Sequence, residues 1–189
     1  MRTIDSPTLN LGLPNRHIMV FDVESIGLHG EGFAVSWCIL DLETGSISEL
    51  QTHACDTALA VGLNDDRNWV TNNVPALATN CNSPKEVRAK FWQTWLHWRN
   101  QNALLAADAA WPVETNFLSA CINDIGPSEH FSGPYPLIDI DALASCSGQR
   151  FTKNLIRLPH ELPLHDPAAD TQFSARRLLS LLTGLSSIN

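Results

Sequence analysis

The sequence predicts an α/β domain built on a mixed central sheet with helices on both faces. Short apolar runs bounded by turn residues alternate with helical segments, in the order strand, strand, strand, helix, strand, helix, strand, helix. The first three strands follow one another through short turns, which is typical of an antiparallel meander. Because 189 residues suffice for one sizeable core, we expect a single domain at 16–189 behind an N-terminal tail at 1–15.

The three strands of the meander are apolar runs in the first third of the chain. The run at 18–21 ends at a glycine-rich turn at 27–32. A second run at 32–42 and a weaker one at 46–55 are joined by the turn at 43–45. Such closely spaced strands pair as hairpins.

A helix is predicted at 83–102, after a polar stretch with a short helix around 65–74. Ser83 suits the N-cap position, and Pro84 suits the first helical position. We interpret the tryptophan-rich face of this helix as core, the alternative being a platform for stacking bases. That face carries apolar residues at helical spacing, namely Val87, Phe91, Trp95 and Trp98.

The remaining elements alternate between strand and helix. A small-residue strand at 103–108 precedes a helix that begins near Pro112, and a short strand follows at 135–143. The last helix, at 166–185, has Asp166 as its N-cap.

Composition argues against several classes of protein. The formal net charge is −8, whereas a wide duplex-binding surface needs a basic stripe. The five cysteines are scattered without a C-x-x-C pair, so we expect neither a disulfide framework nor a zinc site. No signal peptide or 18-residue apolar span is present. We therefore expect a cytoplasmic protein without a membrane partner.

Acidic residues stand at the ends of several predicted elements. Asp22 and Glu24 end the first strand and, two positions apart, point to the same face. The repulsion between the two carboxylates would be offset by a bound cation. Asp108 ends the fourth strand, and Asp170 lies in the first turn of the last helix, five residues after His165. Four carboxylates can hold two Mg²⁺ or Mn²⁺ ions for phosphodiester cleavage, with a histidine as general base.

Three segments carry a resemblance to a known family. They read FDVESIGLHGEGF, AADAAWPVETNFL and LHDPAADTQFSARRLL, at 21–33, 106–118 and 164–179. Together they resemble the exonuclease motifs of the DEDDh 3′–5′ exonucleases, which have a ribonuclease H-like fold. That family includes ribonuclease T, oligoribonuclease and the proofreading subunit of bacterial replicative polymerase. The resemblance runs from about residue 17 to 182, with the motifs in family order.

The resemblance implies a role for each of the five polar residues. Asp22, Glu24 and Asp170 would hold one divalent metal ion, with Asp22 bridging to a second ion. Asp108 would hold that second ion through water, and His165 would be the general base. The tyrosine-bearing sister subgroup is excluded, because Asp166 occupies the place of its tyrosine.

The activity that the resemblance implies is hydrolysis of the 3′-terminal phosphodiester of single-stranded nucleic acid, releasing nucleoside 5′-monophosphates. Small size favours RNA over DNA, although the sequence identifies no group that reads the 2′-hydroxyl. Two rival readings are a ribonuclease H-type endonuclease and a catalytically silent nucleic-acid-binding protein of the same fold. Relatives are frequently dimers, which leaves a homodimer open.

The loop after the first strand is a candidate nucleotide-binding segment. Ser25, Ile26, Gly27 and Leu28 stand where relatives receive the 3′-terminal nucleotide. Ile26 replaces the usual threonine and so loses a hydroxyl for the sugar. Gly27 permits close approach of the backbone, and Leu28 can wedge against the last base.

Further substrate contacts are expected from the second motif and from a basic run. Trp111 and Glu114 are candidates for shaping the nucleotide pocket, with packing at the helix start as the alternative for Trp111. Arg150, Lys153 and Arg157 either contact phosphates upstream of the scissile bond or form a solvated loop.

Overall fold

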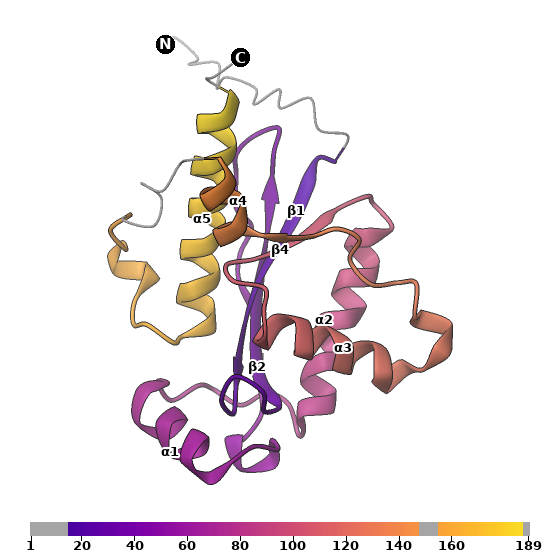
Figure 1. Cartoon of the computed structure of the whole chain (residues 1–189), viewed down its shortest axis with the longest axis vertical. Helices are drawn as coiled ribbons and strands as arrows, with labels where there is room; N and C mark the ends of the chain where they lie inside the picture. The colour runs from indigo at the N-terminus through magenta and orange to yellow at the C-terminus, as the bar shows by residue number, and fades with distance from the viewer. Residues whose placement is uncertain (1–14, 148–154, 187–189) are drawn as a thin grey trace.

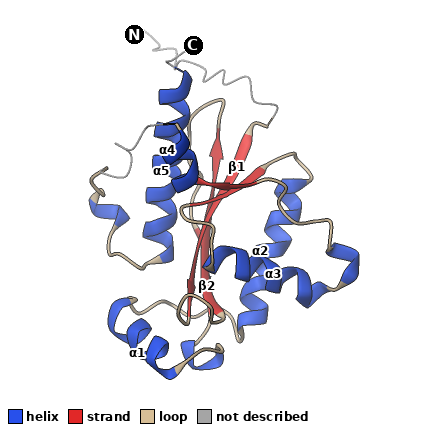
Figure 2. Ribbon diagram, viewed as in Figure 1, coloured by secondary structure: helices blue, strands red, loops and turns tan. Residues whose placement is uncertain are grey.

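The computed structural model describes residues 15–147 and 155–186, which form a five-stranded mixed sheet flanked by helices. The strand order is β3-β2-β1-β4-β5 (Figure 2). β1 to β3 pair antiparallel, whereas β4 runs parallel to β1 and β5 parallel to β4. The strands are β1 His17–Ser25, β2 Gly32–Asp41, β3 Gln51–Ala54, β4 Leu104–Ala107 and β5 Leu137–Asp139.

Helices cover both faces of this sheet. Figure 1 shows α2 and α3 on one side of the long strands, α4 and α5 on the other, and α1 beyond the end of the sheet. The predicted mixed sheet, the three-strand meander and the helices on both faces are therefore confirmed. The helices are α1 Asn64–Asn73, α2 Pro84–Arg99, α3 Val113–Ile125, α4 Ile140–Cys146 and α5 Pro167–Ser186.

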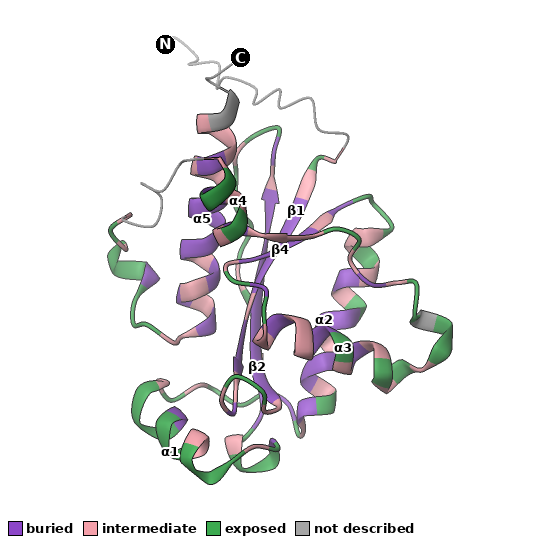
Figure 3. Cartoon of the chain, in the orientation of Figure 1, coloured by how far each residue is buried: buried purple, intermediate pink, exposed green. Residues whose placement is uncertain are grey.

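The alternation of side chains along β1 divides the core into two layers. Phe21 belongs to the core under α2 and α3, whereas Ile18 and Val20 belong to the core under α4 and α5. The central strands are buried along most of their length (Figure 3). Because successive side chains point to opposite faces, Asp22 and Glu24 continue the row of Ile18 and Val20 and point toward the α5 side.

The apolar face of α2 is core, as predicted, and is not a stacking platform. Val87, Phe91 and Trp95 are buried, and the partly buried Trp98 packs against the same core. The Phe91 ring lies 5.0 Å from Phe21, between ring centroids. The predicted N-caps are also present: Ser83 Oγ accepts from the Glu86 N–H at 3.2 Å, and Asp166 Oδ1 accepts from the Ala168 N–H at 2.9 Å.

Two strands are shorter than predicted. Before β3, the expected strand at 46–55 contributes only an isolated bridge between Leu40 and Ile47. The strand expected at 135–143 ends at Asp139, whose carboxylate accepts from the Ala142 N–H at 2.7 Å. Aspartate in this position starts a helix, and the apolar residues that follow form α4 instead.

Two further predictions concern the N-terminal tail and membrane-spanning segments. Apart from Asn15, the predicted tail at 1–15 lies outside the described residues. Within the described part of the chain, no helix is both long and apolar enough to cross a membrane.

Candidate active site

A cavity of about 560 Å³ opens at the edge of the sheet where β1 ends. Because β1 and β4 are parallel, their carboxyl ends lie at the same edge, and the first turns of α3 and α5 contribute residues there. The acidic and basic residues lining the cavity near these ends are Asp22, Glu24, Glu114, His165 and Asp170. Four carboxylates and one imidazole thus meet in one place.

The carboxylates from β1 and α5 are close together and short of positive charge. One ligand-type atom each of Glu24, His165 and Asp170 lies within 4.8 Å of the other two. Burial, and then repulsion from neighbouring carboxylates, raises the pKa of Glu24 to about 8 and that of Asp22 well above its ordinary value. Burial also raises the pKa of Asp170, although Arg157 opposes the shift. Such shifts are typical of sites that bind cations or move protons.

Glu114 is the fourth carboxylate near the strand ends. It lies in the first turn of α3 and is buried, and burial raises its pKa to about 7. Among the charged neighbours of Asp22, Glu114 exerts the largest repulsion. The sequence analysis gave Glu114 only a role in shaping the pocket. Its position in the first turn of a helix, which it shares with Asp170, was the available signal.

Asp108, which the resemblance assigns to the second ion through water, is paired with an arginine of α5. The carboxylate pairs with the buried guanidinium of Arg177 on α5, which also binds Asp141. Asp108 is absent from the lining of the 560 Å³ cavity. The residue directly follows β4, and Arg177 compensates the charge of its carboxylate.

His165 is held in an uncommon backbone conformation beside Asp170. Its φ is +61°, in the left-handed region, which histidine adopts more readily than most residues. The His165 N–H donates to Asp170 Oδ2 at 3.0 Å, and the imidazole meets the Trp69 ring edge-on, 5.0 Å between centroids. Asp170 thus holds the backbone of His165, and Trp69 contacts its imidazole at the cavity. Trp69, on the predicted short helix, had no assigned role in the sequence analysis.

Arg157 is the described member of the basic run. Its guanidinium pairs with Asp170, donates to the Glu161 carbonyl at 3.0 Å and lies 4.3 Å from the centroid of Phe173. It therefore reaches the site by binding one of the acids. Arg150 and Lys153 lie outside the described residues.

The candidate nucleotide loop is divided between core and cavity. Ser25 Oγ donates to the Gly27 carbonyl at 2.6 Å, and Gly27 has a φ of +70°. Leu28 is 65% exposed and lines the cavity. The side chain of Ile26 is fully buried in the core, so it has no substrate-facing surface. The pairing register of β1 with β2 shifts between Glu24 and Ser25, and Ile26 belongs to the core of Phe21 and Val23 rather than to the row of Glu24.

Trp111 lines the mouth of the cavity and is 70% exposed. A tryptophan used for packing at a helix start would be largely covered. The position of Trp111 thus favours contact with a ligand over core packing.

The residues present fit divalent cations. Carboxylate oxygens are the preferred ligands of Mg²⁺ and Mn²⁺, and an imidazole is compatible with Mn²⁺. Among the described ion pairs, the four acids near the strand ends have one arginine partner, Arg157. Burial, and then repulsion that no cation offsets, raises the pKa values of Asp22 and Glu24, and bound cations would lower them.

Neither a family model nor a curated protein sequence matches the chain. Solved structures do match. The nuclease domain of 3′hExo, a DEDDh family member bound to rAMP, has a TM-score of 0.50 and 12% identity, over 90% of this chain and 94% of that one. Exonuclease I from Methylocaldum szegediense has a TM-score of 0.61 and 14% identity, over 90% and 43%. A full-length 3′-exonuclease has a TM-score of 0.53 and 11% identity, over 90% and 61%.

The chain thus spans most of the 3′hExo nuclease domain and less than two thirds of the other two proteins. At these identities the likeness concerns the fold. The predicted resemblance is confirmed at that level: the chain has the ribonuclease H-like fold of the DEDDh 3′-exonucleases.

Proposed function

We propose that the protein is a metal-dependent 3′–5′ exonuclease that hydrolyses the 3′-terminal phosphodiester of single-stranded nucleic acid and releases nucleoside 5′-monophosphates. The observation that carries this proposal is the convergence of four carboxylates and His165 in one cavity of a fold shared with 3′-exonucleases. The acidic net charge of −8 also favours a substrate held at its end rather than along a wide duplex surface.

Asp22, Glu24, Glu114 and Asp170 are the residues that would hold the metal ions. Two divalent cations would neutralise these carboxylates and the negative charge that develops on the phosphoryl oxygens. Glu114 replaces Asp108 in this set, because Asp108 is already paired with Arg177. Arg157 lies beside Asp170, so its guanidinium is also placed to meet a phosphate oxygen.

His165 is the general base of the proposed reaction. The imidazole accepts a proton from the attacking water while the water oxygen bonds to phosphorus and the bond to the leaving 3′-oxygen breaks. The leaving oxygen takes up a proton from solvent. The hydrogen bond from the His165 backbone to Asp170 and the contact between the imidazole and Trp69 place His165 at the cavity for this transfer.

The proposed activity predicts a ladder of products from a single-stranded oligonucleotide labelled at its 5′ end. With Mn²⁺ or Mg²⁺ the products should shorten one nucleotide at a time from the 3′ end, and EDTA should stop the reaction. Internal fragments would indicate an endonuclease instead. An intact substrate, in the presence of folded protein and metal, would indicate a silent binding protein.

Replacement of Glu114 separates the two candidates for the fourth ligand. Glu114→Gln should abolish measurable turnover, because it removes a carboxylate from the cavity. Asp108→Asn should retain most of the activity, because an amide oxygen can still accept from Arg177. Rates on the labelled oligonucleotide, with circular dichroism to verify folding, check both. Loss of activity in Asp108→Asn together with retained activity in Glu114→Gln would make Asp108 the fourth metal ligand.

Replacement of His165 tests the general base. His165→Ala should slow the single-turnover rate roughly 10²- to 10⁴-fold, the range for a lost general base. The concentration of Mn²⁺ at half-maximal rate should change little. A near-normal rate would remove His165 from the chemistry, and a large rise in the Mn²⁺ requirement would make it a metal ligand.

Metal-free protein should lose stability as the pH rises. The pKa of Glu24 is about 8 and that of Glu114 about 7 in the folded state, against 4.5 for an ordinary glutamate. The folded state therefore binds more protons than the unfolded state, and the free energy of unfolding falls between about pH 4.5 and 8, on the order of a few kcal/mol.

Urea unfolding in EDTA at several pH values measures this loss. Glu24→Gln should flatten the decline, and Mn²⁺ should stabilise the wild type most above pH 7, where the carboxylates are ionised. If the free energy of unfolding of Glu24→Gln fell with pH as steeply as that of the wild type, Glu24 would not be a source of the pH dependence.

A further inference from the structure

Helix α1 presents two residues to the catalytic cavity. Asp66 and Trp69, three positions apart and so on one face of the helix, both line the 560 Å³ cavity. Only Val70 of α1 is buried (Figure 3). The helix is anchored by Arg67, which donates to the Ala60 carbonyl at 2.8 Å. Helix α1 contributes little to the core. The main consequence of its position is that Asp66 and Trp69 lie at the cavity.

The Asp66 carboxylate packs directly against the nucleotide loop. A Cβ added to Gly27 would lie 2.4 Å from both Cγ and Oδ2 of Asp66. Glycine at position 27 is therefore what allows the carboxylate to approach the loop. Within the described part of the chain, the Asp66 side chain has no hydrogen bond or ion pair. An acceptor without a protein partner thus faces the backbone expected to receive the terminal sugar.

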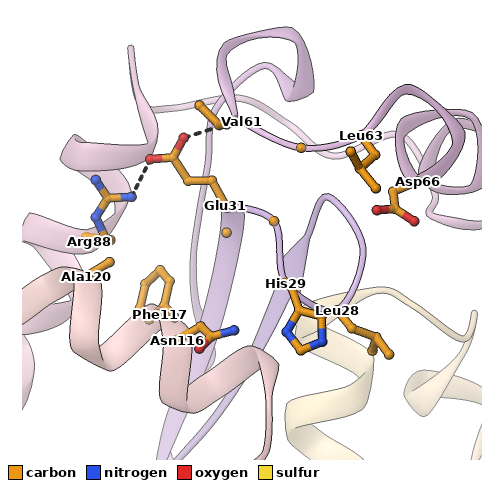
Figure 4. Close-up of a pocket in the computed structure, with 13 residues that line it drawn as sticks. Leu28, His29, Glu31, Val61, Leu63, Asp66, Arg88, Asn116, Phe117 and Ala120 are labelled. Carbon is orange, nitrogen blue, oxygen red and sulfur yellow. Dashed lines mark hydrogen bonds and ion pairs between the residues drawn. The ribbon is translucent and has the colours of Figure 1, made fainter.

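Asp66 also stands at the boundary between two cavities. Beside the catalytic cavity lies a second one of about 790 Å³, and the two share only Asp66 and Leu28 in their linings. Figure 4 shows Asp66 reaching from α1 toward this second cavity, with Leu28 and His29 below and Phe117 across from them. The size of the second cavity and its partly apolar lining are typical of a pocket for a small molecule.

The order of groups in a nucleotide matches this arrangement. The sugar joins the phosphate on one side to the base on the other. With the scissile phosphate at the carboxylates and the base in the second cavity, the sugar passes Asp66. The 2′-carbon is bonded to the carbon that bears the base. The 2′-hydroxyl therefore lies on the side of the sugar that faces Asp66, at the boundary between the two cavities.

We infer that Asp66 accepts a hydrogen bond from the 2′-hydroxyl of the 3′-terminal ribose and thereby makes the site selective for RNA over DNA. This inference rests on the proposed function for the position of the phosphate. An ionised carboxylate can only accept hydrogen bonds, and a hydroxyl donating to it forms a charge-assisted bond. A deoxyribose end lacks this donor and leaves Asp66 unpaired, which is how a protein distinguishes RNA from DNA.

Binding of adenosine 5′-monophosphate and its 2′-deoxy analogue, by calorimetry with Mn²⁺, tests the inference without turnover. Wild type should bind the ribonucleotide roughly 10- to 100-fold more tightly, as expected for one hydrogen bond to a charged group. Asp66→Ala should remove this difference by weakening only the ribonucleotide. Asp65→Ala, which alters the exposed neighbouring acid, should preserve it. Equal affinities in wild type, or a preference that survives in Asp66→Ala, would overturn the inference.

Cleavage of two oligonucleotides that differ only in the 2′ position of the terminal nucleotide gives a second readout. Asp66→Ala should lower kcat/KM on the ribose end to the value for the deoxyribose end and leave the latter unchanged. Equal loss on both substrates would mean that Asp66 only supports the fold of the site. If neither substrate were cut while the difference in nucleotide binding held, the exonuclease proposal would fail and the Asp66 assignment would stand.

Discussion

Electrostatic repulsion among carboxylates at one edge of the sheet is the constraint on which the rest of the site depends. The strand that carries Asp22 and Glu24 is central and covered on both faces, so these acids cannot move apart. The two apolar cores on either side of β1 stabilise the fold enough to tolerate the strain. Repulsion held in place by the core would favour the binding of cations, because a bound cation would relieve it.

Arginine residues decide which acids remain available. Arg177 compensates Asp108 and Asp141. Arg88 binds Glu31 at 2.7 Å and Asp124 at 2.6 Å, and Arg176 binds Glu161 at 2.6 Å. The acids of the cavity have only Arg157, at Asp170, among the described ion pairs. Asp22, Glu24 and Glu114 have no arginine partner among the described ion pairs, and their raised pKa values accompany the proposed chemistry.

Segments outside the sheet complete the site. α1 supplies Asp66 and Trp69, and the segment before α5 supplies Arg157 and His165. Trp69 joins these two parts through its contact with His165. The sheet edge thus provides the carboxylates, while these peripheral elements hold the proposed base, and Asp66 provides the proposed recognition of the sugar. In the proposed function, chemistry and specificity would therefore be carried by different layers of the same fold.

The sequence by itself determined the sheet and its helices, the face of β1 that carries Asp22 and Glu24, and the N-caps at Ser83 and Asp166, because periodicity and capping are local properties. Only the tertiary structure decided that Arg177 pairs with Asp108 while Glu114 enters the cavity. It likewise buried Ile26 and brought α1 to the site. Those outcomes depend on contacts between segments far apart in the chain, and spacing within one segment does not encode them.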